Sequence, residues 1–108
     1  MKSLIYDLFE EKTRRNFIGL SRIVTFDNRL SPTSLRLIHV LMHLFNNSVR
    51  CAFPSEIYLA KQLDVTPRSI RNAVRQLEDL GYLAVDRSQR LNKYIPRFSL
   101  FVEKDSGK

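Results

Sequence analysis

The chain has 108 residues, 44% hydrophobic and 27% charged, and this length and composition predict a single soluble globular domain. Eighteen Lys and Arg against eleven Asp and Glu give a net charge of +7, which favours a polyanionic partner, nucleic acid before an anionic membrane. One cysteine excludes an internal disulfide, and no apolar run or secretory signal marks a membrane or exported protein, so we expect a cytoplasmic protein.

The amino-terminal segment predicts a short helix over residues 3–15, capped by Ser3. Its apolar stripe is Leu4, Ile5, Leu8 and Phe9. Residues 17–26 are rich in β-branched and aromatic side chains and predict a short strand, and residues 27–29 predict a turn.

A strongly apolar helix is predicted to follow. Ser31 caps it, Pro32 occupies its first position, and it runs to about Asn46. Its apolar positions at helical spacing are Leu35, Leu37, Ile38, Val40, Leu41, Met42, Leu44 and Phe45. We expect this helix to be the central packing element.

Two further helices are predicted close together. Ser55 caps the first, which spans about residues 55–63 and turns inward Ile57, Leu59, Ala60 and Leu63. Asp64-Val65 forms the turn, and Thr66-Pro67 begins the second helix, which ends at Gly81, a residue suited to a left-handed cap.

A hairpin completes the predicted domain. Residues 82–86 and 93–102 predict strands on either side of a polar tip at residues 87–92. Pro96 has no amide donor, so we expect its strand to lie at an edge or to contain a bulge. Residues 103–108 are polar and predict a disordered tail.

The helix over residues 66–80 has two chemically opposite faces. Ile70, Ala73, Val74 and Leu77 share one face at helical spacing, so burying them turns the other face outward. That other face holds Arg68, Arg71, Asn72 and Arg75. Arginine recognises guanine and asparagine recognises adenine in the DNA major groove, so this helix is a predicted DNA-recognition helix.

Residues 53–94 resemble a winged-helix DNA-binding domain. Gln76-Leu-Glu-Asp-Leu-Gly-Tyr-Leu83, followed by the basic hairpin with Asn92-Lys-Tyr94, is similar to the helix-to-wing passage of GntR- and MarR-type bacterial regulators. Together with Phe17-Ile-Gly-Leu-Ser-Arg-Ile and residues 30–38, it resembles more closely the helix-turn-helix domains of plasmid and phage replication initiators and DnaD-like proteins. Asp64 departs from the glycine common in such turns.

The fold class that follows is α+β and mostly helical: a winged helix-turn-helix with a β-hairpin wing and an extra amino-terminal helix. We expect an amino-terminal extension over residues 1–16, the winged helix over 17–102 and the tail over 103–108. The resemblance implies double-stranded DNA as the partner, recognised by residues 66–80 and the basic wing at 87–93. The predicted contacts are Thr66, Arg68, Ser69, Arg71, Asn72, Arg75, Arg87, Arg90 and Lys93.

Three roles stay open. The first is replication, partition or copy control of a plasmid or phage in a bacterial cytoplasm; the second is transcriptional repression; the third is a protein-interaction module. The apolar stripe of residues 4–9 suggests a possible homodimer. His39 and His43 stand at i, i+4, but no third ligand accompanies them, so we expect no metal site. We also expect no cofactor, small-molecule ligand, membrane partner or catalytic activity.

Overall fold

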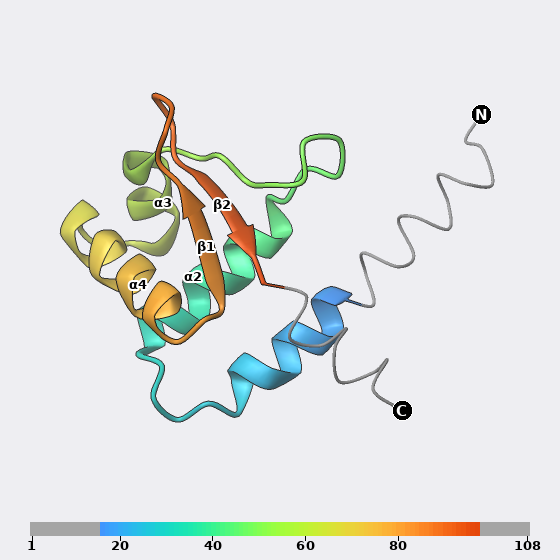
Figure 1. Cartoon of the computed structure of the whole chain (residues 1–108). Coiled ribbons are helices and arrows are strands. Elements are labelled where there is room, and N and C mark those ends of the chain that lie inside the picture. Colours follow the sequence, from blue (N-terminus) through green and yellow to red (C-terminus); the bar gives the residue numbers. More distant parts are fainter. Residues whose placement is uncertain (1–15, 98–108) are drawn as a thin grey trace.

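A computed structural model describes residues 16–97, and these form a mostly helical α+β fold (Figure 1). After helical residues 16–25 come α2 (Pro32–His43), α3 (Glu56–Leu63), α4 (Pro67–Asp79), β1 (Leu83–Asp86) and β2 (Lys93–Pro96). This confirms the expected winged helix-turn-helix fold class. The helix predicted over residues 3–15, the end of the second predicted strand and the tail lie outside the described residues.

The strand expected within residues 17–26 is wrong, because residues 16–25 are helical. Leu20 and Val24, one helical turn apart, are fully buried. Phe17 packs edge-on against Phe45, with ring centroids 5.5 Å apart. Burial of one face at helical spacing therefore outweighs the strand preference of the β-branched and aromatic residues.

Helix α2 begins as expected and ends earlier than expected. The Ser31 hydroxyl accepts a hydrogen bond from the Ser34 amide at 3.1 Å, with Pro32 at the first position. The predicted end at Asn46 is wrong, because the helix stops at His43. Asn46 instead forms a backbone bridge with Cys51, and its side chain accepts from the Ser48 amide at 2.8 Å, which closes a turn.

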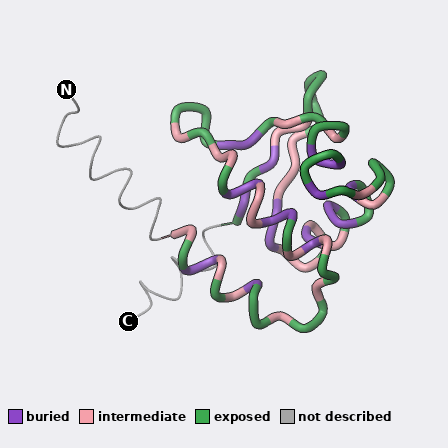
Figure 2. The backbone as a smooth tube through the Cα atoms, turned by 180° about the vertical axis from the view of Figure 1, so that it is seen from behind, coloured by how far each residue is buried: buried purple, intermediate pink, exposed green. Residues whose placement is uncertain are grey.

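One hydrophobic core joins all the described elements, and the buried positions follow the inner sides of the helices and of the hairpin (Figure 2). Helices α2 and α4 cross at two small residues. Ser34 is fully buried, and its hydroxyl donates to the Ala73 carbonyl at 3.4 Å. Small side chains at this crossing allow the two helix axes to approach closely.

Helix α3 buries three of the four side chains expected to turn inward. Leu59, Ala60 and Leu63 are buried, but Ile57 is 63% exposed, so that expectation is wrong for Ile57. Ile57 lies on the flank of the buried stripe, beside the loop that joins β1 to β2. The hairpin loop rises past the amino-terminal end of α3 (Figure 1).

The two strands pair antiparallel, with Leu83 opposite Pro96 and Asp86 opposite Lys93 in a continuous register without the bulge considered above. On the side away from β1, β2 bonds to one residue of the loop between α2 and α3. Tyr94 and Ala52 exchange backbone hydrogen bonds of 2.7 and 2.9 Å. Alternate residues of a strand bond to opposite sides, so Pro96, two residues beyond Tyr94, removes no bond to β1.

Candidate nucleic-acid interface

The turn between α3 and α4 is tight and lies at the predicted residues, Asp64 and Val65. Asp64 has φ 57° and ψ 48°, a conformation that aspartate tolerates better than most residues. The Val65 amide donates to the Ala60 carbonyl at 3.0 Å. From α2, Arg36 donates to the Leu63 carbonyl at 3.1 Å, which satisfies the carboxyl-terminal end of α3. These bonds fix the angle between the two helices.

Helix α4 begins with a cap in which the Thr66 hydroxyl forms two hydrogen bonds with Ser69. The Thr66 side-chain oxygen accepts from the Ser69 amide at 3.1 Å, and its hydroxyl donates to the Ser69 hydroxyl. Both residues are predicted DNA contacts, and in the structure both form the amino-terminal cap of the helix. They lie at the amino-terminal end of α4, the end that a helix-turn-helix presents to base edges.

The two faces of α4 are oriented as the sequence predicted. Ile70 and Leu77 are fully buried, and Ala73 and Val74 are 3% and 6% exposed. The opposite face exposes Arg68, Arg71, Asn72 and Arg75. Arg68, Arg71 and Arg75 follow one another at i, i+3, i+7 and form what we call the arginine stripe.

Residues 27–31, the loop before α2, hold α4 from the side. Gln76 accepts from the Ser31 amide at 3.0 Å and donates to the Arg29 carbonyl at 2.9 Å. The Tyr82 hydroxyl donates to Asp27, which also accepts from the Arg29 side chain at 2.6 and 2.9 Å. The Arg29 bond first, and the Tyr82 bond second, hold the pKa of Asp27 well below its usual range. No local sequence pattern indicates these long-range bonds.

The hairpin wing is tied to the end of the arginine stripe. Glu78 lies three residues beyond Arg75 and accepts two hydrogen bonds from Arg87, at 2.7 and 2.9 Å. This pairing lowers the pKa of Glu78 and raises that of Arg87. Arg87, a predicted wing contact, therefore lies beside α4 rather than free at the hairpin tip.

The other two predicted wing contacts occupy different environments. Arg90 is exposed at the hairpin tip. It shares a small cleft with the first turn of α3, including Glu56 and Ile57. Lys93 is half-buried at the start of β2, opposite Asp86. The structure thus brings Arg87 to α4 and leaves Arg90 as the exposed cation of the tip.

Within the stripe, one arginine is held by a carboxylate. The Arg71 Nη1 atom donates to the Glu56 Oε1 atom of α3 at 3.1 Å. Arg68 and Arg75 form no hydrogen bond or ion pair within residues 16–97. Glu56 was not singled out from the sequence, because nothing in the local pattern around it indicates a partner fifteen residues away.

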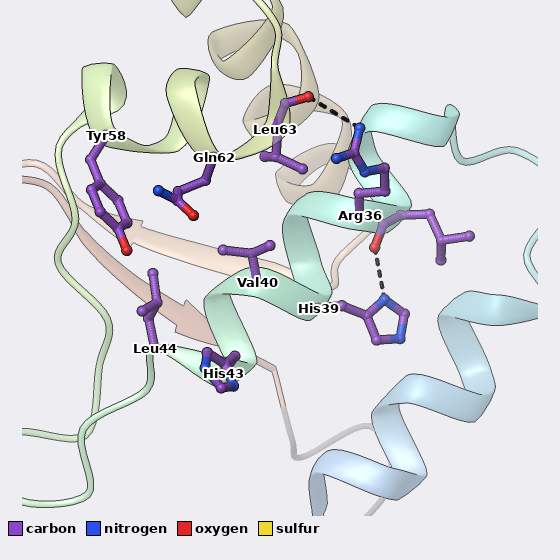
Figure 3. Close-up of a pocket in the computed structure, with 9 residues that line it drawn as sticks. Arg36, His39, Val40, His43, Leu44, Tyr58, Gln62 and Leu63 are labelled. Carbon is purple, nitrogen blue, oxygen red and sulfur yellow. Dashed lines mark hydrogen bonds between the residues drawn. The ribbon is translucent and has the colours of Figure 1, made fainter.

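The paired histidines lie in a groove between α2 and α3, about 750 Å³ in volume (Figure 3). The Nδ1 atom of His39 donates to the Leu35 carbonyl, and its Nε2 atom bonds to the Ser21 hydroxyl, both at 2.8 Å. His39 therefore joins α2 to the preceding helix, with both ring nitrogens occupied. In the part of the chain that the structure describes, no group of three or more His, Cys, Asp or Glu is placed to hold a metal.

The fold and this surface together define a helix-turn-helix domain, a class of DNA-binding domain. A family model described as a helix-turn-helix domain matches residues 28–83, and the chain belongs to that family. No match was found among curated proteins. Among residues 16–97, no helix has the length and apolar character needed to cross a bilayer.

Proposed function

We propose that the chain binds double-stranded DNA sequence-specifically, with α4 in the major groove and the hairpin against the adjacent backbone. The observation that carries this proposal is the exposed arginine stripe above a fully packed inner face. Arg87 and Arg90 continue the basic surface onto the wing. Arginine suits both guanine and phosphate, and arginine on a wing that dips into a narrow minor groove would be attracted to it.

The proposed contacts are those predicted from the sequence, with divided roles. Arg68, Arg71, Asn72 and Arg75 face the bases or the flanking phosphates. Thr66 and Ser69 lie at the capped amino-terminal end of α4, where free amides favour phosphate. The DNA backbone beside the wing is contacted by Arg87, Arg90 and Lys93. No catalytic step and no cofactor belongs to this proposal.

For the biological role, we propose replication, partition or copy control of a plasmid or phage replicon in a bacterial cytoplasm. Support comes from the resemblance of residues 17–38 and 53–94 to domains of replication initiators. Repression of transcription is the alternative role. We also propose that the winged helix occupies residues 17–102 and that two copies bind adjacent half-sites, since one such domain covers a single half-site.

Selection of bound duplexes from a random library tests the proposal directly. A shared motif among the recovered duplexes is expected, and binding to a duplex that contains it should fall on the order of a thousandfold between 50 and 200 mM salt if about six phosphates are contacted. Genomic mapping then separates the roles. Repeated short sites near an origin indicate replication or partition, whereas one palindrome at a promoter indicates repression.

Failure to retain any random duplex at low salt would refute DNA binding and favour the protein-interaction alternative. Retention of duplexes without any enriched motif would refute sequence specificity alone. The Arg68→Ala variant provides an internal check. It should weaken binding without changing the thermal unfolding midpoint, because Arg68 is exposed and forms no bond within the described residues.

A further inference from the structure

Glu56 of α3 lies against the middle of the arginine stripe, and its position suggests a role in base recognition. Resting on the DNA binding proposed above, we propose that Glu56 is a positioning residue. Its carboxylate fixes the direction of the Arg71 guanidinium, so that Arg71 recognises one guanine. Loss of Glu56 would then change which base is preferred, rather than only how tightly DNA is held.

The geometry that supports this proposal joins two different helices. The Glu56 carboxylate accepts from one terminal nitrogen of Arg71 at 3.1 Å, which leaves the remaining N–H groups of the fork available. The Arg71 side chain is 57% exposed and that of Glu56 is 33% exposed, so the arginine is the more exposed member of the pair. Arg71 also lies in the amino-terminal half of α4, the half that approaches base edges.

Glu56 itself has a fixed place in the fold. It is the first residue of α3, directly after the Ser55 cap, and the amino-terminal end of a helix stabilises a negative charge. The α3–α4 angle is fixed by the Asp64 turn and by the bond from Arg36 to Leu63. The backbone position from which the Glu56 carboxylate reaches Arg71 is therefore fixed relative to α4.

The neighbouring arginines provide the contrast. Arg68 and Arg75 have no hydrogen bond or ion pair among residues 16–97, so their long side chains are free to follow a phosphate. Arg71 gives up part of that freedom and part of its attraction to phosphate. An exposed ion pair adds little to the stability of a fold, so the larger consequence of this pair is the direction that it gives to Arg71. A fixed fork suits the paired acceptors of guanine.

The test compares the motifs that four variants select from a library of random duplexes. These are Glu56→Gln, Arg71→Ala, the double variant, and Asp79→Asn as a matched control. Asp79 is an exposed carboxylate at the end of α4 with no hydrogen bond or ion pair among the described residues, so Asp79→Asn removes the same charge without touching Arg71. Thermal unfolding confirms that each variant is folded.

We expect Glu56→Gln to weaken the preference for guanine at one motif position by roughly tenfold, at the same position that Arg71→Ala affects. Total binding to random duplex should stay the same or increase, because a negative charge is removed. Asp79→Asn should leave the motif unchanged. In the Arg71→Ala background, Glu56→Gln should cause no further change in base preference.

Two results would overturn the inference while leaving sequence-specific binding intact. One is a Glu56→Gln motif identical to that of the unmodified protein or of Asp79→Asn. The other is an Arg71→Ala variant that loses affinity equally for all duplexes, which would make Arg71 a phosphate contact. If the unmodified protein itself selects no motif, the proposed function fails, and this inference fails with it.

Discussion

The inner and outer faces of α4 share one backbone and differ in what surrounds them. The inner face, made of Ile70, Ala73, Val74 and Leu77, is buried in the hydrophobic core. The outer face holds the arginine stripe in solvent. The inner face therefore determines stability and orientation, and the outer face is available for binding. Substitutions on the two faces should separate these two properties.

The largest effect is expected at the inner face. Leu77→Ala should lower the free energy of unfolding by about 2–5 kcal/mol, because Leu77 is fully buried and the truncation leaves a cavity. Urea denaturation measures this loss, with Leu77→Met as the control that nearly conserves volume. A loss well below 1 kcal/mol for Leu77→Ala would show that α4 does not pack as described.

On the outer face, Arg75→Ala should weaken binding to a selected duplex by about 1–3 kcal/mol if Arg75 contacts a base. Its effect on unfolding should stay within about 0.5 kcal/mol, because the side chain is exposed. Gel-shift titration at fixed salt and urea denaturation provide the two measurements. Equal losses in stability and in binding would contradict the separation of the two faces.

The lateral support of α4 should have an intermediate effect. Tyr82→Phe removes the hydroxyl that donates to Asp27 and should destabilise the fold by about 1–2 kcal/mol. DNA affinity of the folded protein should be unchanged. Tyr58→Phe, which alters an exposed tyrosine of α3, is the matched control. Reduced affinity without reduced stability would place Tyr82 at the binding surface instead.

The same support predicts an acid-dependent loss of stability. The pKa of Asp27 is depressed in the folded chain, so its contribution is present above the unfolded pKa of about 3.9 and is lost as pH falls through the folded value. Denaturation between about pH 5 and pH 2 should therefore show a smaller loss for Asp27→Asn than for the unmodified protein. Parallel profiles would contradict this assignment.

The smallest effect is expected where the wing meets α4. Arg87→Ala removes the exposed pair with Glu78 and should change the free energy of unfolding by about 0.2–1 kcal/mol. If Arg87 also contacts phosphate, the slope of log affinity against log salt should fall by about one unit. An unchanged slope would make Arg87 a link between the wing and α4 only.

Local pattern predicted most of the recognition unit. The Ser55 and Thr66 caps, the turn at Asp64, the left-handed Gly81 and the inward face of α4 depend on neighbours within a few residues. Prediction failed where distant contacts decide the conformation. Residues 17–26 were expected to form a strand because of their composition, whereas packing of Leu20 and Val24 against the core makes them helical.

By itself, the sequence determined that α4 is an amphipathic helix with an arginine face, because helical periodicity and capping are local properties of the chain. The tertiary structure alone determined that Glu56 holds Arg71, that Glu78 holds Arg87, and that Gln76 and Tyr82 anchor α4 to residues 27–31. These pairs join residues between nine and fifty-five positions apart. They exist only because the core fixes the relative positions of helices, loop and hairpin.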